Sequence, residues 1–144
     1  MFGYLYIAEE LAIDNSFKLA PTDFSKIGIT TQRSPSERLR KLQAGNPRKI
    51  HMPYMWVGMT ERISYLEQRV KARYYSNRRL EWIYRPSGEV KDYVESLLDG
   101  LGDIHLIPNR YLPYDASSYG HCSFNSKSTT DIFFESKDYV KNKA

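Results

Sequence analysis

The sequence predicts one α+β or α/β domain with a small central sheet. Two N-terminal segments alternate apolar and polar side chains as half-buried strands do, apolar residues further along recur at helical spacing, and strand and helix patterns alternate. The 144 residues suffice for one domain with a real core, with or without an appendage. An apolar fraction of 41% and a charged fraction of 26% are typical of a soluble globular protein.

The first two expected strands are residues 2–8 and 24–30, whose side chains alternate strictly. If these strands pair, their aliphatic residues face one side of the sheet, towards a core. Tyr6 and Lys26 then share the opposite face. The connection between the strands, residues 9–23, is long for a hairpin.

A helix is predicted next, because Ser34-Pro35-Ser36-Glu37 combines an N-cap, a proline at the first helical position and a capping-box acid. It ends near Gly45-Asn46-Pro47. The run 51–58 then reads as a third strand, and Pro53 places it at a sheet edge.

A second amphipathic helix covers residues 61–75, with Ile63, Leu66 and Val70 on its apolar stripe. Glu67 lies at the edge of that stripe or within it. The other charges of this helix reach water from its far face, so a single acid directed inward needs a partner.

Three further elements complete the first part of the chain. A basic turn at 77–79 precedes a short strand at 81–84, and Ser87 caps a helix that ends at Gly100 and Gly102. From Asp103 the composition changes, with only a brief strand near 105–108 and a short element over 131–140. We therefore expect a domain over 1–102 and a C-terminal extension of unassigned role over 103–144.

Charge and cysteine content narrow the function classes. The net charge is +4, and residues 26–49 hold seven Lys or Arg against one acid, which favours an anionic partner. The single cysteine, Cys122, excludes an internal disulfide and a cysteine-based zinc site, which favours a reducing, cytoplasmic compartment. No apolar run approaches the roughly 20 residues of a membrane span, and the N-terminus lacks a signal-peptide pattern, so no membrane partner is expected.

The order and spacing of five short motifs resemble the GIY-YIG nuclease superfamily over roughly residues 2–98. Tyr4-Leu5-Tyr6 is similar to the first motif and Lys26-Ile27-Gly28 to the second; Arg38-Leu39, Leu66-Glu67 and Glu81-Trp82 follow. The lysine in the second motif and the Glu-Trp strand look most like a branch of phage and bacterial proteins often described only as DNA-binding. A bacterial or phage-infected cell is the expected setting.

The resemblance implies a three-stranded antiparallel sheet flanked by helices and a DNA endonuclease that uses one divalent metal, Mg²⁺ or Mn²⁺. By that resemblance Tyr6 is a general base or orients the attacking water, and Lys26 assists that water. Arg38 contacts the scissile phosphate and Glu67 binds the metal. The chemistry agrees, since a phosphodiester transition state gathers charge that an arginine and a metal stabilise, and Mg²⁺ suits a carboxylate with several waters.

The sequence departs from the family pattern at three points. Lys26 replaces the second-motif tyrosine, Leu42 stands where a histidine often follows the arginine, and Asn77 is only a candidate for the polar residue after the glutamate. Further DNA contacts are predicted for Tyr4, Arg33, Arg40, Lys41, Arg69, Arg73, Arg78 and Arg79.

Each predicted site residue also has a structural alternative. Tyr6 is a packing residue across strands, Lys26 a solvated edge lysine, and Arg38 a surface ion-pair partner. Glu67 pairs with Arg38, Lys71 or an arginine of the 78–79 turn. For the whole protein, the main alternative is a DNA-binding module that has lost catalysis, and a third is a protein-interaction domain. Sequence-specific cleavage at this size calls for a homodimer or another subunit.

Overall fold

A central six-stranded sheet organises the computed structural model, which describes residues 1–31, 35–113 and 128–143. The strand order is β4-β5-β2-β1-β3-β6, and every described pair is antiparallel. The strands are β1 (Phe2–Ile13), β2 (Leu19–Thr30), β3 (Lys49–Met59), β4 (Arg78–Arg79), β5 (Trp82–Tyr84) and β6 (Ile104–Leu106). The α+β class is confirmed, and the expected three strands are the centre of a wider sheet.

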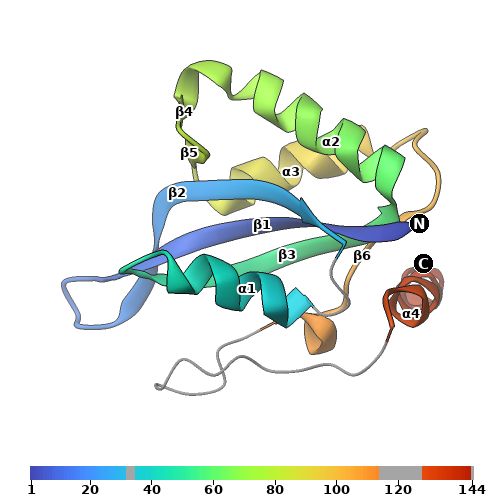
Figure 1. Ribbon diagram of the computed structural model, residues 1–144, viewed down its shortest axis with the longest axis horizontal. Coiled ribbons are helices and arrows are strands. Elements are labelled where there is room, and N and C mark those ends of the chain that lie inside the picture. The colour runs from blue at the N-terminus through green and yellow to red at the C-terminus, as the bar shows by residue number, and fades with distance from the viewer. Residues whose placement is uncertain (32–34, 114–127, 144) are drawn as a thin grey trace.

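Four helices cover the two faces of this sheet (Figure 1). They are α1 (Pro35–Ala44), α2 (Thr60–Arg73), α3 (Ser87–Leu97) and α4 (Thr129–Lys143), with short 3₁₀ turns at Tyr75–Asn77 and Asn109–Tyr111. Helices α2 and α3 lie on one face, and α1 and α4 on the other. No helix in the described ranges is long and apolar enough to cross a membrane.

Alternation along β1 divides the core into two clusters, one on each face. Tyr4 and Tyr6 point to the α1 and α4 face, where Leu39 and Ile132 pack. The odd positions of β1 point to the other face, and that cluster contains Leu5, Ile7, Ile27, Trp56, Ile63, Leu66, Val70, Val90 and Val94. The predicted division of β1 and β2 into an aliphatic face and a polar-aromatic face is therefore confirmed.

Both N-terminal strands are longer than expected. The register of β1 shifts between Glu9 and Leu11 on its β2 side, and this irregularity ends the alternation from which residues 2–8 were predicted. The predicted long connection is wrong, because a tight turn joins the strands. In that turn the Asp14 carboxylate accepts hydrogen bonds from the backbone N–H groups of Ser16 (2.8 Å) and Lys18 (3.1 Å).

The third strand is interior, and the prediction that Pro53 marks an edge is wrong. β3 pairs with β1 on one side and, at Trp56–Gly58, with β6 on the other. The β1–β3 register shifts between Ile7 and Glu9, opposite Pro53. A proline fits there because the regular ladder of hydrogen bonds is interrupted and β6 does not reach it.

The described part of the C-terminal region packs on the same core. β6 extends the sheet, and Ile132 and Phe133 of α4 are buried beside β1 and β3. The Phe133 ring lies 4.6 Å from that of Phe2, centroid to centroid. A division of the chain at residue 102 stays a prediction.

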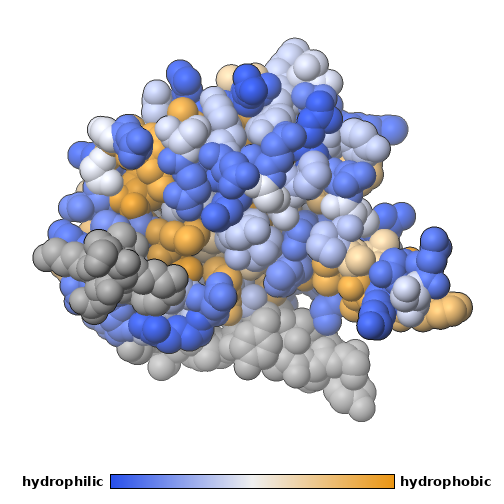
Figure 2. Space-filling model, turned by 180° about the vertical axis from the view of Figure 1, so that it is seen from behind, coloured by the Kyte–Doolittle hydropathy of each residue, from blue (hydrophilic) through white to orange (hydrophobic). Residues whose placement is uncertain are grey.

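The surface seen from behind is mostly hydrophilic, with apolar residues gathered in small patches (Figure 2). Ile13, Phe17 and Leu19 are exposed near the tip of the β1–β2 hairpin. Phe17 is 90% exposed and has φ 60°, a backbone conformation uncommon for a bulky residue.

Candidate active site and nucleic-acid interface

Tyr6 and Arg38 form the first pair of the candidate site. The Tyr6 hydroxyl accepts a hydrogen bond from Nε of Arg38 at 3.0 Å, and the guanidinium lies 5.8 Å from the centre of the Tyr6 ring. Tyr6 is 0% exposed, while Arg38 on α1 is half-buried. The Tyr6 hydroxyl therefore holds the Arg38 guanidinium against the surface of the sheet.

Gly28 makes this arrangement sterically feasible. It lies directly opposite Tyr6 in the β1–β2 register, and the Tyr6 ring leans across it. A Cβ added at Gly28 would lie 2.4 Å from the Tyr6 hydroxyl oxygen. The glycine of the second motif therefore provides the space in which the phenol reaches Arg38.

Lys26 follows on the same face of β2 and pairs with Glu81. Its Nζ lies 2.6 Å from Oε2 of Glu81, and the two side chains are 11% and 72% exposed. The hydrogen bond and charge of Lys26 lower the pKa of Glu81, and the charges of Lys71 and Arg38 act in the same direction. Cations from β2, α2 and α1 therefore act together on one carboxylate.

Glu67 joins this group through Lys71. The Glu67 side chain is 18% exposed, and its Oε2 lies 3.7 Å from Nζ of Lys71, one turn further along α2. This is one of the structural alternatives stated for Glu67. The described contacts do not join Glu67 directly to Tyr6 or Arg38. The link is indirect, because Lys71 pairs with Glu67 and the charges of Lys71 and Arg38 both lower the pKa of Glu81.

The open part of β2 is where these groups collect. β5 pairs only with Phe24 and Ser25 of β2, so residues 26–30 have no outer strand in the described part of the chain. α2 packs against β1 and β2 on one face of the sheet, and α1 packs against β3 on the other (Figure 1). The four predicted catalytic residues are thus divided into the pairs Tyr6–Arg38, Lys26–Glu81 and Glu67–Lys71.

The carboxylates of Glu67 and Glu81 would suit a hard divalent cation. Within residues 1–31, 35–113 and 128–143, no three His, Cys, Asp or Glu side chains form a metal-holding cluster. Mg²⁺ is commonly held by one or two carboxylates with waters, so a small oxygen-donor set fits it. Lys71 pairs with Glu67, and its charge lowers the pKa of Glu81, so the surroundings of these two acids favour a cation.

The predicted DNA contacts have different environments. Tyr4 is wrong as a contact, because it is 0% exposed in the core, where burial raises the pKa of its hydroxyl. Tyr6 lies on the same face and is also 0% exposed, but its hydroxyl contacts Arg38. Arg33 lies outside the described residues. Five of the predicted contacts are exposed cations: Arg40, Lys41, Arg69, Arg73 and Arg79. Arg78 is half-buried, and its Nε has no hydrogen-bond partner among the described residues.

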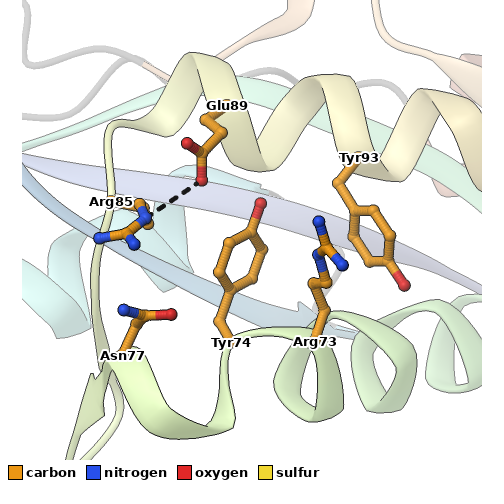
Figure 3. A pocket seen from close by; sticks show the side chains of 6 residues that line it. All are labelled: Arg73, Tyr74, Asn77, Arg85, Glu89 and Tyr93. Atoms are coloured by element: carbon orange, nitrogen blue, oxygen red, sulfur yellow. Dashed lines mark ion pairs between the residues drawn. The ribbon is translucent and has the colours of Figure 1, made fainter.

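Arg73 lies in a separate cavity of about 450 Å³ between α2 and α3 (Figure 3). Its guanidinium is 5.5 Å from the centre of the Tyr93 ring, and Arg85 pairs with Glu89 at 3.5 Å. Burial, and then the charge and hydrogen bond of Glu89, raise the pKa of Tyr74. This cavity is on the α2 and α3 face, so it does not include Tyr6 or Arg38.

Two residues of the site were missed from the sequence as functional groups. The arginines at positions 78 and 79 are the nearest cations to Glu81 along the chain, but in the structure Glu81 pairs with Lys26. The β2–β5 register explains this pairing. Ser25 lies opposite Ile83, so Glu81, two residues before Ile83, lies near Lys26. Lys71 was considered only as a partner for Glu67, and its charge also acts on Glu81.

Comparison of the chain with protein-family models, with curated proteins and with solved structures found no match.

Proposed function

We propose that this protein is a metal-dependent endonuclease that hydrolyses phosphodiester bonds in DNA. One observation carries the proposal: Lys26, 11% exposed at the open edge of β2, pairs with the 72% exposed carboxylate of Glu81, on the sheet face that also carries the Tyr6–Arg38 pair. A phosphodiester is an anion whose transition state gathers more charge on its oxygens. A site with several convergent cations and an adjacent metal-binding acid suits such a substrate.

The roles follow from the contacts. Arg38 binds the scissile phosphate, and Tyr6 positions it through the hydrogen bond to Nε. The scissile phosphate displaces Glu81 from Lys26, whose ammonium group then contacts both the phosphate and the attacking water beside it. Tyr6 is fully buried, so it acts through Arg38 in the described structure and not as the base that contacts water.

Glu67 would hold Mg²⁺ or Mn²⁺ once Lys71 moves aside. The ion, when bound, supplies Lewis-acid stabilisation of the phosphate oxygens and acidifies a bound water. The exposed cations of α1, α2 and β4 then bind neighbouring phosphates. Cytoplasmic action and a homodimer that presents two such sites to the two strands of a duplex are parts of the same proposal.

The second candidate is a DNA-binding module without catalysis. It is favoured by the burial of Tyr6 and by the Glu67–Lys71 pair, since both residues already have structural partners. The two candidates agree on DNA affinity that falls steeply with salt, by orders of magnitude where several phosphates are contacted. They differ only in whether Glu67 supports bond cleavage.

Nicking of supercoiled plasmid, with Mg²⁺, Mn²⁺ or EDTA, tests the proposal. We expect the wild type to nick only with metal, and Glu67→Gln to lose about 100-fold or more in rate with DNA affinity changed less than about twofold. Glu61→Gln is the matched control, because Glu61 is exposed on the first turn of the same helix. Full activity of Glu67→Gln would contradict the proposal.

A second variant separates the two acids. Glu81→Gln removes the carboxylate that competes with phosphate, so we expect DNA affinity at low salt to rise about two- to fivefold. Salt-sensitive binding in a gel shift without nicking by any variant would favour the binding module. Absence of salt-sensitive binding would exclude both candidates and favour a protein-interaction domain.

A further inference from the structure

A second cavity, of about 380 Å³, lies next to the candidate site. Its apolar lining comes from Phe24 on β2, Trp82 on β5 and Leu80 in the turn between β4 and β5. Its charged lining comes from Glu10, Arg48 and Arg79. A cavity of this size with mainly apolar walls and a few polar groups is typical of a small-molecule or nucleobase pocket.

The position of this cavity links it to the proposed phosphate site. Phe24 and Lys26 are two residues apart on the same face of β2, a spacing of about 7 Å. Trp82 directly follows Glu81, the ion-pair partner of Lys26. A nucleotide whose phosphate lies at Lys26 therefore has a neighbour that reaches the cavity.

Leu80 lies at the mouth of the cavity in a backbone conformation that leucine seldom adopts. It is 86% exposed and has φ 56°, a conformation that costs a leucine roughly 1 kcal/mol or more. An asparagine or glycine fits such a turn without that cost. A leucine held there at the mouth of an aromatic cavity provides an apolar surface beside Trp82 that packing within the protein does not use.

Charge at the cavity matches a nucleotide and not a neutral apolar ligand. Arg79 is exposed and faces Trp82 across the β4–β5 pair. Arg48 is 55% exposed and lies 3.5 Å from the Glu10 carboxylate. The pair of arginines provides two phosphate contacts, and the Glu10–Arg48 pair provides an acceptor and donors for the edge of a base.

We propose that this cavity holds a DNA base that has left the helical stack, next to the phosphate bound at Lys26. The inference rests on the proposed function and names its substrate class: DNA with an unpaired base near the cleavage position. The base packs against Trp82 and Leu80, and Arg48 and Arg79 bind the phosphates on either side of it. Base–aromatic stacking corresponds to a preference of about 5- to 150-fold, and a partly open cavity to the lower part of that range.

The test compares two short duplexes of one sequence, one fully paired and one with a single bulged 2-aminopurine. Binding of each is measured by fluorescence anisotropy, with EDTA present so that no strand is cut. We expect the wild type to bind the bulged duplex about tenfold more tightly, and Leu80→Gly to reduce that preference by about three- to fivefold, because the base then packs against Trp82 without the leucine. A change in 2-aminopurine fluorescence on binding reports whether the base changes its stacking partners.

Phe17→Gly is the matched control. Phe17 has the same sign of φ and a similar exposure, at 60° and 90%, but lies in the β1–β2 turn, whose residues do not line the cavity. Glycine suits both backbones, so both variants are expected to fold. Phe17→Gly should keep the full preference for the bulged duplex.

The outcomes separate this inference from the proposed function. Salt-sensitive binding to both duplexes with equal affinity overturns the cavity proposal and leaves the nuclease proposal standing. Retained preference in Leu80→Gly also overturns it. No salt-sensitive binding to either duplex overturns both proposals, and loss of preference in Phe17→Gly as well would show that the effect is not specific to this cavity.

Discussion

Gly28→Ala tests the packing that positions Tyr6. The added methyl group would lie 2.4 Å from the Tyr6 hydroxyl oxygen and 2.5 Å from the ring carbon that bears it, closer than any real contact. Tyr6 is 0% exposed in the core, so its ring has little room to move. The substitution should therefore displace the ring and break its hydrogen bond with Arg38.

The magnitude follows from three contributions. Overpacking a core costs about 1–3 kcal/mol, and losing a hydrogen bond to a charged group costs about 1.5–3 kcal/mol. Replacing glycine in a strand returns about 0.5–1 kcal/mol through reduced freedom of the unfolded chain. We expect a net loss of about 2–5 kcal/mol, which at an m-value of about 2 kcal/mol/M lowers the urea midpoint by about 1–2.5 M.

Urea unfolding monitored by far-UV circular dichroism measures this loss, with Gly88→Ala as the control. A Cβ at Gly88 in α3 has nothing within 4 Å, and alanine is the better helix former, so this variant should gain about 0.5–1 kcal/mol. A Gly28→Ala midpoint equal to that of the wild type would refute the reasoning. It would mean that Tyr6 is not held over the glycine in solution.

Two further predictions concern a hydrogen bond and a titration. Tyr6→Phe removes the acceptor for Arg38 and should cost about 1–2 kcal/mol in urea unfolding and about tenfold in nicking, with a smaller loss of DNA affinity because other cations also bind phosphates; unchanged nicking would show that Tyr6 does not act through Arg38. Burial lowers the pKa of His105, so the folded state disfavours its protonation, and this histidine reduces stability as pH falls below its unfolded value of about 6.5. His105→Gln should therefore lose less stability than the wild type between pH 8 and pH 5.5, and parallel losses would show that His105 is not responsible.

The elements with regular patterns were predictable from the sequence. Alternation identified the paired faces of β1 and β2, and the helical period identified α2 with Ile63, Leu66 and Val70 buried. Short strands were predicted at 81–84 and 105–108, where β5 and β6 lie, but the two residues of β4 were assigned to a turn. The places of these strands in the sheet are set by pairing with β2, β3 and each other, which no local signal encodes.

Prediction of the site was limited by burial and by pairing across the sheet. Strand alternation placed Tyr4 and Tyr6 on the same face of the sheet. Only the tertiary structure shows that both are buried and that the Tyr6 hydroxyl contacts Arg38. Glu81 could not be assigned to Lys26 from its own segment, since two arginines lie two and three residues before it along the chain. The register of two residue pairs between β2 and β5 decides its partner.

The exposure of Glu81 is the feature that connects stability with the proposed function. An exposed surface ion pair contributes at most about 1 kcal/mol, so a 72% exposed glutamate is a weak structural anchor for Lys26. Lys26 itself is only 11% exposed, and without an anion its charge would be held in a partly buried place. A loosely held anion over a nearly buried cation is easily exchanged for a stronger one. In the proposed function that stronger anion is a phosphate, and the open edge of β2 lies beside Lys26.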